Sequence, residues 1–112
     1  MLSSRKSIRP IIIAIDKGYL CNLKELDLQC MNDMGLIIIL DCRITDRNVQ
    51  LLLSVIYKGK CPILQSLNLS NNAMGRNGCK MLSLCLSSDC FDSIQRIDIQ
   101  RITTVIHHLI TR

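Results

Sequence analysis

A set of apolar residues recurs along this chain at a constant spacing, which we call the repeat step. The matching residues are Met34, Ile37 and Ile39, then Leu64, Leu67 and Leu69, then Ile94, Ile97 and Ile99. The repeat step of about 30 residues is typical of stacked units, each of which buries its apolar side only against its neighbours. It therefore predicts a stack of similar units, a solenoid, and limits the fold more than any other feature of the sequence.

The middle copy carries the most specific pattern. Residues 64–74 have the sequence LQSLNLSNNAM, which matches L-x-x-L-x-L-x-x-N-x-L with methionine in the last position. Asn72 takes the asparagine position, whereas the earlier copy has Cys42 there. The turn CRITD at 42–46 and the turn NAMGRNG at 72–78 add two further local motifs.

Together these motifs resemble leucine-rich repeats, and the two turns resemble those of the long, ribonuclease-inhibitor-like subclass. The resemblance covers roughly residues 21–100. It implies an α/β fold, a leucine-rich-repeat solenoid in which strands and helices form a right-handed βα superhelix, here incomplete and holding three to four repeats. It also implies that the side-chain amide of Asn72 bonds backbone groups at the turn after the strand, since an amide has both donors and acceptors.

The spacing within one unit predicts a strand followed by a helix. Apolar residues two apart indicate a short strand with one buried side, and apolar residues three and four apart indicate an amphipathic helix. Gly75 and Gly78 are expected to let the chain bend away from the strand. We predict strand, turn, helix and return over residues 64–94, with a shared core of Leu67, Leu69, Met74, Leu82 and Leu86.

Two more helices are predicted from the same spacing. One contains Val49, Leu52, Leu53 and Ile56; the other contains Ile8, Ile11, Ile12 and Ile15 and leads into a strand at Leu23, Leu26 and Leu28. Asp46 is expected to cap the first of these helices and Gly59 to end it. Pro10 is expected in the first turn of the other, where a missing N–H costs little.

The repeat step fails at one place, because Leu23 and Met34 are much closer together in the sequence than one step. A parallel strand pair needs a crossover of about a dozen residues or more, and residues 31–35 are too few. Either residues 36–40 are not a separate strand, or the chain lacks about one helix. We favour the second interpretation.

The length of 112 residues allows one domain at most. We expect a basic N-terminal segment and helix at 1–20, the repeats at 21–101, and a helical tail or truncated repeat at 102–112. Solenoids need polar caps at their ends, and neither terminus supplies one. The interpretation that follows is a fragment, or one end, of a longer array.

Seven cysteines raise the alternative of a secreted disulfide scaffold. The odd number, the lack of a secretory signal and the core positions of Cys42 and Cys79 favour reduced thiols and an intracellular location, cytoplasmic or nuclear. His107 and His108 are adjacent and there is no C-x-x-C pair, so no metal site is expected. No motif places a nucleophile beside a base or forms a phosphate loop, so we expect no enzyme, no catalytic residue and no cofactor.

The formal net charge of +5 suggests nucleic acid as a partner, but the charge is concentrated near the N-terminus. With only three aromatic residues the chain offers no stacking platform, and we expect no specific nucleic-acid binding. A mitochondrial presequence at the N-terminus is an alternative to a solvated basic segment. The apolar run 11–15 is too short to span a membrane.

In a solenoid of this kind the strand side chains that point away from the core form a concave binding face. The predicted rows are Glu25, Asp27 and Gln29; Leu36, Ile38 and Leu40; Ser66, Asn68 and Ser70; and Arg96, Asp98 and Gln100. The apolar second row is either a contact surface or a buried part of a truncated unit. We expect a scaffold that binds a protein partner through this face. The alternatives are a regulator of the GTPase-activator type and a fragment without independent function.

Overall fold

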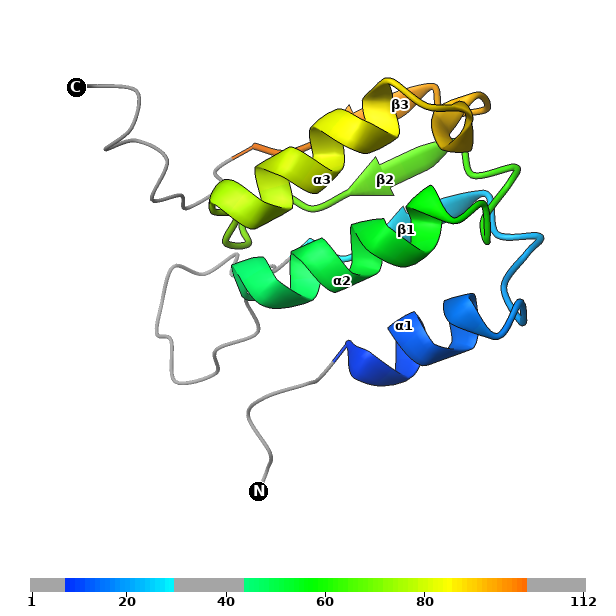
Figure 1. The fold of residues 1–112 in the computed structure, drawn as a ribbon, viewed down its shortest axis with the longest axis horizontal. Helices are drawn as coiled ribbons and strands as arrows, with labels where there is room; N and C mark the ends of the chain where they lie inside the picture. Colours follow the sequence, from blue (N-terminus) through cyan, green and yellow to red (C-terminus); the bar gives the residue numbers. More distant parts are fainter. Residues whose placement is uncertain (1–7, 30–43, 101–112) are drawn as a thin grey trace.

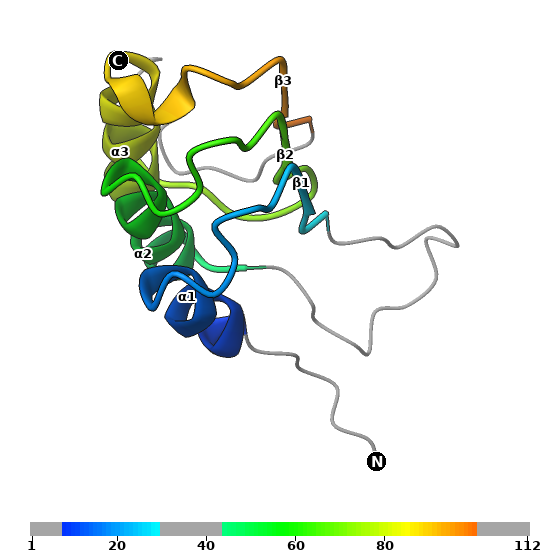
Figure 2. The same ribbon diagram turned by 90° about the vertical axis from the view of Figure 1, so that its right-hand side faces the viewer.

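The computed structural model describes residues 8–29 and 44–100, which form an α/β fold with one open, parallel sheet of three strands. The elements in chain order are α1 (Arg9–Asp16), β1 (Glu25–Asp27), α2 (Asp46–Tyr57), β2 (Ser66–Asn68), α3 (Arg76–Leu86), the 3₁₀ helix η1 (Asp89–Phe91) and β3 (Arg96–Asp98). The three α-helices stand side by side on one side of the sheet (Figures 1 and 2). The predicted α/β class is confirmed.

The strands lie in the order β1-β2-β3, with Leu26, Leu67 and Ile97 level with one another. Leu67 and Ile97 are one repeat step apart, as predicted, whereas Leu26 and Leu67 are separated by more than one step. Because β1 and β2 are hydrogen-bonded neighbours, no strand lies between them. The place predicted for residues 36–40, between the first and third copies, is therefore wrong; those residues themselves lie outside the described part of the chain.

The same geometry explains the break in the repeat step. Ile44 and Met74 take equivalent buried positions, and the N–H of Ala73 donates to the carbonyl of Ile44 at 3.0 Å. The segment from Leu28 to Ile44 is much longer than the equivalent segment from Leu69 to Met74. The additional residues thus lengthen the connection between β1 and α2. Our favoured interpretation, a missing helix, concerns residues 30–43 and lies outside the described part of the chain.

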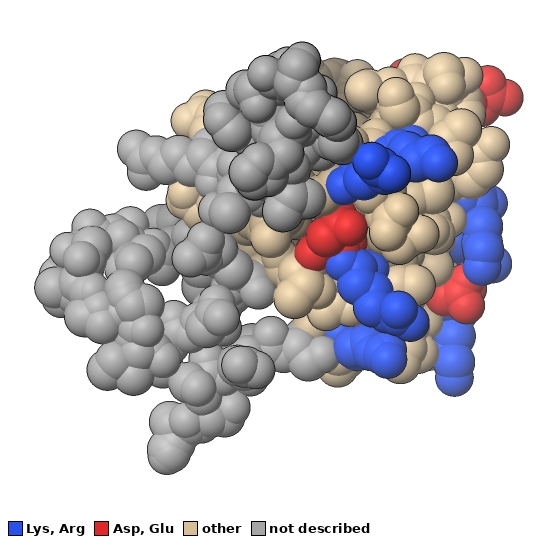
Figure 3. Space-filling model, turned by 60° about the vertical axis from the view of Figure 1, so that its left-hand side comes forward, with Lys and Arg blue, Asp and Glu red and all other residues tan. Residues whose placement is uncertain are grey.

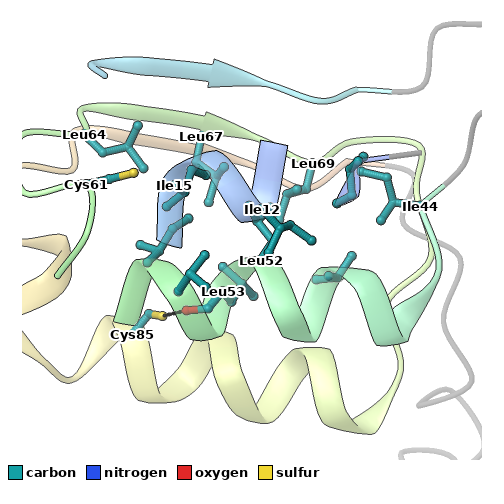
Figure 4. Close-up of a cluster of buried hydrophobic side chains, with 14 of the residues drawn as sticks. Ile12, Ile15, Ile44, Leu52, Leu53, Cys61, Leu64, Leu67, Leu69 and Cys85 are labelled. Carbon is teal, nitrogen blue, oxygen red and sulfur yellow. Dashed lines mark hydrogen bonds between the residues drawn. The ribbon is translucent and has the colours of Figure 1, made fainter. Parts of the chain in front are cut away.

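The core lies between the helices and the sheet. Its fully buried side chains come from the three α-helices, β2 and the segments that flank β2 (Figure 4): Ile15, Val49, Leu52, Leu53, Ile56, Cys61, Leu64, Leu67, Leu69, Asn72 and Cys85. Apolar burial of this kind stabilises a domain by about 1.5–3 kcal/mol for each large aliphatic side chain.

Four of the five side chains predicted to share this core do so, and one does not. Leu67, Leu69 and Met74 are buried, and Leu82 is partly buried against them. Leu86 is 58% exposed, so its predicted burial is wrong. Of the described α-helices only α2 lies beside α3, and the face of α3 that meets it carries Cys85. The last turn of α3 therefore buries Cys85 and leaves Leu86 outside.

One of our expectations about the helix ends, the cap of α2, is wrong, and two others are confirmed. The hydroxyl of Thr45 accepts from the N–H of Asn48 at 3.3 Å, so the N-cap of α2 is Thr45 and not Asp46. Pro10 lies in the first turn of α1, where its missing N–H has no helical partner to lose. Gly59, directly after the C-cap of α2, has φ +85°, a conformation that favours glycine and ends the helix as predicted.

In the turn after β2, the residue that bends the chain is not one of the two predicted glycines. Asn71 has the left-handed conformation, with φ 63°, while Gly75 and Gly78 keep negative or extended backbones. Asparagine tolerates that region better than other residues with a side chain. Gly78 has a different role: a Cβ there would lie 2.7 Å from Oδ1 of Asp46 and 2.9 Å from Cγ of Met74. It permits close packing of α3 on its neighbours.

Candidate functional site

The candidate site is the face of the sheet that points away from the helices (Figure 2). Strand pairing places its outward side chains in two level rows, Glu25–Ser66–Arg96 and Asp27–Asn68–Asp98. Glu25, Asp27 and Arg96 are exposed, and the other three are partly buried. The structure thus brings six of the twelve predicted residues together on one face.

An ion pair between Arg96 and Asp98 lies on this face. Nε of Arg96 donates to Oδ2 of Asp98 at 2.9 Å, and the Arg96 side chain is 71% exposed. Oδ1 of Asn68 accepts from the N–H of Ser70 at 3.0 Å, and Oδ1 of Asp27 accepts from the N–H of Gln29 at 3.1 Å. These contacts fix the side chains that begin each turn after a strand.

The last residue of three predicted rows, namely Gln29, Ser70 and Gln100, was placed on this face, and that placement is only partly correct. Gln100 is exposed and Gln29 is half-buried, but Ser70 is 4% exposed and does not face solvent. Its hydroxyl accepts from the N–H of Gln100 at 3.0 Å, which ties the turn after β2 to the residue that follows β3. Placing Ser70 on the binding face was wrong because its hydroxyl is used inside the sheet. The predicted residues Leu36, Ile38 and Leu40 lie outside the described part of the chain.

Asn72 organises the carboxyl edge of the sheet. It is fully buried, its Oδ1 accepts from the N–H of Ile44 at 2.7 Å, and its Nδ2 donates to the carbonyl of Leu28 at 2.8 Å. Nδ2 also donates to the carbonyls of Leu69 and Ser70, at 3.0 and 3.3 Å. One amide thereby joins the turns after β1 and β2. The side-chain role expected for Asn72, bonding backbone groups at the turn, is confirmed.

Sequence analysis missed the contact that joins α2 to α3. Oδ1 of Asp46 accepts from the backbone N–H groups of Gly75 and Gly78, the latter at 2.8 Å. A carboxylate at a helix N-terminus satisfies donors that have no partner within the helix. Asp46 therefore caps the helix of the next unit. The sequence does contain a pair of glycines close to one repeat step after Asp46, which is a sign of this contact. Local spacing, however, does not show that Asp46 is their partner.

The described cysteines, Cys21, Cys61, Cys79, Cys85 and Cys90, are free thiols. Burial raises the pKa of Cys85 to about 12, and the nearby Cys90 adds to the shift. Burial also raises the pKa of Cys61 and Cys79, with smaller contributions from Cys21 and Asp46 respectively. A thiol is nucleophilic as the thiolate, so these three groups are poor nucleophiles at neutral pH.

Charge is distributed unequally between the two faces. Exposed Arg9, Arg47, Arg76 and Lys80 lie on the helices, where Figure 3 shows basic side chains interrupted by acidic ones. On the sheet face, Glu25 and Asp27 are exposed, and Arg96 is already paired with Asp98. The sheet face is therefore less basic than the rest of a protein whose net charge is +5.

Neither a protein-family model, nor a curated protein, nor a solved structure matches this chain. Among the described residues, no group of three or more His, Cys, Asp and Glu side chains is arranged to hold a metal ion. No helix within residues 8–29 and 44–100 has the length and apolar character to cross a membrane.

Proposed function

We propose that this chain is a short leucine-rich-repeat solenoid that binds a protein partner through the outward face of its sheet. The offset of one repeat step between paired strands β2 and β3 supports the repeat. The position of Asn72 and its bonds to two neighbouring turns support it further. The three α-helices lie on the other side of the sheet, so no described helix covers the face that we propose for binding.

The observation that carries the proposal is the set of level polar side chains on this face. Glu25 and Ser66 are held in register by the backbone pairing of β1 and β2, and their side chains bond to no other described residue. The pairing fixes the backbone positions of these polar groups, so a partner meets them at a set spacing, and ordering a long side chain such as that of Glu25 still costs about 0.5–1.5 kcal/mol. The face presents donors and acceptors at the spacing of neighbouring strands, about 4.8 Å.

A site-specific photo-crosslinker tests this proposal. It is placed at Asp27 on the sheet face and, in a matched variant, at Lys80 on the helix face, both of which are exposed. In cells we expect a discrete crosslinked protein from position 27 that untagged chain competes away, and no such product from position 80. Products from position 80 alone, or equal products from both positions, would contradict binding through the sheet.

We also propose an intracellular location, which the five free thiols of the described residues support. Disulfides form in oxidising compartments and are rare in the cytosol and nucleus. Mass spectrometry of protein alkylated without reduction should find every thiol modified after denaturation. Two or more native disulfides would show that the location is wrong without bearing on the binding face.

A further inference from the structure

Among the described residues, no α-helix or strand lies on the outer side of α3 and β3. We define the C-terminal end face by the apolar residues of α3, of β3 and of the chain on either side of β3 that would meet a following unit: Leu82, Leu86, Ile94, Ile97 and Ile99. At the equivalent positions one repeat step earlier, the side chains are at most 1% exposed. In the C-terminal end face Leu86 is 58% and Ile99 is 43% exposed, and the others are half-buried.

The opposite end of the stack has the complementary form. Leu26 of β1 is level with buried Leu67, yet it is only half-buried, as are Leu23 and Leu28 beside it and Ile11 of α1. The outer edge of β1 and the outer edge of β3 both lack a strand partner among the described residues. The strands are parallel, so the two free edges have the same direction and can continue one sheet.

We propose that the C-terminal end face binds the β1 and α1 end of a second copy of this chain. In that contact β1 of the second copy pairs with β3, and its α1 packs against α3. The chain already makes this kind of contact internally, because β1 pairs in parallel with β2 and α1 packs against α2. The new junction continues the same pattern between molecules.

Charge favours the second copy as the occupant. If the observed register continues, Glu25 of the second copy is level with Arg96, just as Glu25 and Arg96 are both level with Ser66 within one chain. The Arg96 side chain is 71% exposed and its guanidinium is available to a second carboxylate. Asp27 of the second copy falls beside Asp98, whose carboxylate already accepts from Arg96 at 2.9 Å. These two level carboxylates repel each other, and the contact of Arg96 with Asp98 reduces that repulsion.

The contact joins different surfaces of the two copies, so it is heterologous. Such contacts do not close unless rotation brings the ends together. Each added copy leaves a new C-terminal end face, and we expect the mass in solution to rise past that of a dimer as concentration increases. Residues 101–112 follow β3 in the sequence and are the competing occupant of the same face.

Sedimentation of the full chain at low ionic strength, from about 1 to 100 μM, tests the proposal, since screening is weak there. The wild type should increase in mass with concentration. Arg96→Glu and Glu25→Arg should each weaken association at least about tenfold, because each places like charges at the junction. Arg47→Glu, on the middle helix, is the control and should associate as the wild type does.

Mixing the two single variants gives the decisive result. Copies of Arg96→Glu repel one another, and so do copies of Glu25→Arg. In a mixture, the carboxylate introduced by Arg96→Glu meets the guanidinium introduced by Glu25→Arg. At the other junction, the native Arg96 of the second variant meets the native Glu25 of the first. The mixture should therefore regain concentration-dependent mass with the two variants in equal amounts. A wild type that remains a monomer throughout would overturn the proposal. Association that is unchanged in both variants, or that the mixture does not restore, would also overturn it.

Discussion

The middle unit and the C-terminal unit of this molecule have nearly the same apolar pattern but very different burial. Ile56 in α2 and Leu69 after β2 are completely buried, whereas their counterparts one repeat step later, Leu86 and Ile99, are 58% and 43% exposed. The side chains are of similar size and lie at equivalent positions. The difference is that α2 has an α-helix on each side, and α3 is flanked by an α-helix on one side only among the described elements.

The comparison suggests how neighbouring elements set the contribution of each apolar residue to stability. An apolar residue in a repeating unit contributes according to the neighbours that cover it, so the same pattern stabilises a central unit more than an end unit. Paired substitutions at equivalent positions can measure this difference directly. The two members of each pair have the same local sequence role and differ only in tertiary surroundings.

The largest difference is expected for a charge placed in each strand. Leu67→Asp puts an unpaired carboxylate at a fully buried position and should destabilise the protein by more than about 4 kcal/mol. Ile97→Asp, at the paired position of β3, should cost about 1–2 kcal/mol because solvent reaches that side chain. Urea unfolding followed by circular dichroism measures both. Equal losses would mean that β3 is as well covered as β2.

Truncation of the helices provides the second pair. Ile56→Ala opens a cavity at a position with no exposed surface, and the expected cost is about 2–5 kcal/mol. Leu86→Ala removes a side chain that is 58% exposed and should change the unfolding free energy by less than about 0.5 kcal/mol. Thermal unfolding of the two variants at one protein concentration separates them. A large loss for Leu86→Ala would indicate that this side chain is covered in solution.

Side-chain hydrogen bonds allow the β1–β2 junction and the β2–β3 junction to be compared. Asn72→Ala leaves the N–H of Ile44 and the carbonyl of Leu28 without their partner, and we expect a loss of about 2–4 kcal/mol. Ser70→Ala removes the hydroxyl that accepts from the N–H of Gln100 and should cost about 1 kcal/mol. Native-state hydrogen exchange should show faster opening of β1 in the first variant and of the segment after β3 in the second. The reverse assignment would contradict these roles.

A smaller effect is expected where α3 packs closely on its neighbours. Alanine is a better helix former than glycine by about 1 kcal/mol, yet Gly78→Ala should destabilise the protein by about 1–2 kcal/mol. The reason is that the new Cβ would lie 2.7 Å from Oδ1 of Asp46. In an Asp46→Ala background that conflict is absent and the contact with Cγ of Met74 at 2.9 Å remains, so Gly78→Ala should cost less than in the wild type. A double-mutant cycle measured by denaturation decides the matter, and strict additivity would exclude the proposed clash.

An effect that is absent at neutral pH and appears only at high pH is expected where the middle unit has Val55 and the C-terminal unit has Cys85. Burial raises the pKa of Cys85 from 9.0 to about 12. Because the folded state disfavours the thiolate, its contribution to stability is complete below pH 9.0 and is lost as pH rises toward 12. Unfolding free energies between those pH values should fall more steeply in the wild type than in Cys85→Val. Parallel slopes would show that this thiol does not titrate differently in the two states.

Much of the local structure followed from the sequence. The alternation around Leu67 and the three-and-four spacing in the helices correctly predicted the strands and helices, because those periods are set by backbone geometry. The sequence also predicted Pro10 in the first turn of α1 and Gly59 at the end of α2, where backbone conformation restricts the residue type. Two rows of the candidate face followed from the same alternation along β1, β2 and β3.

What failed were conclusions that depend on neighbours in space. The break in the repeat step after Leu23 led us to place residues 36–40 between the first and third copies, and only the pairing of β1 with β2 showed that these two strands are direct neighbours. Asp46 looked like a cap for its own helix but binds the backbone of the next one. Ser70 looked like a surface residue, yet its hydroxyl bonds the N–H of Gln100.

The sequence by itself determined the kind of each element and the order of elements, because strand and helix periods and the preferences of proline and glycine act within a few residues. Tertiary structure alone decided which strands are neighbours, which helix Asp46 caps and which of two equivalent leucine or isoleucine positions is buried. These depend on contacts between segments that lie one repeat step or more apart in the sequence. Burial is a property of what covers a side chain, and local spacing does not contain that information.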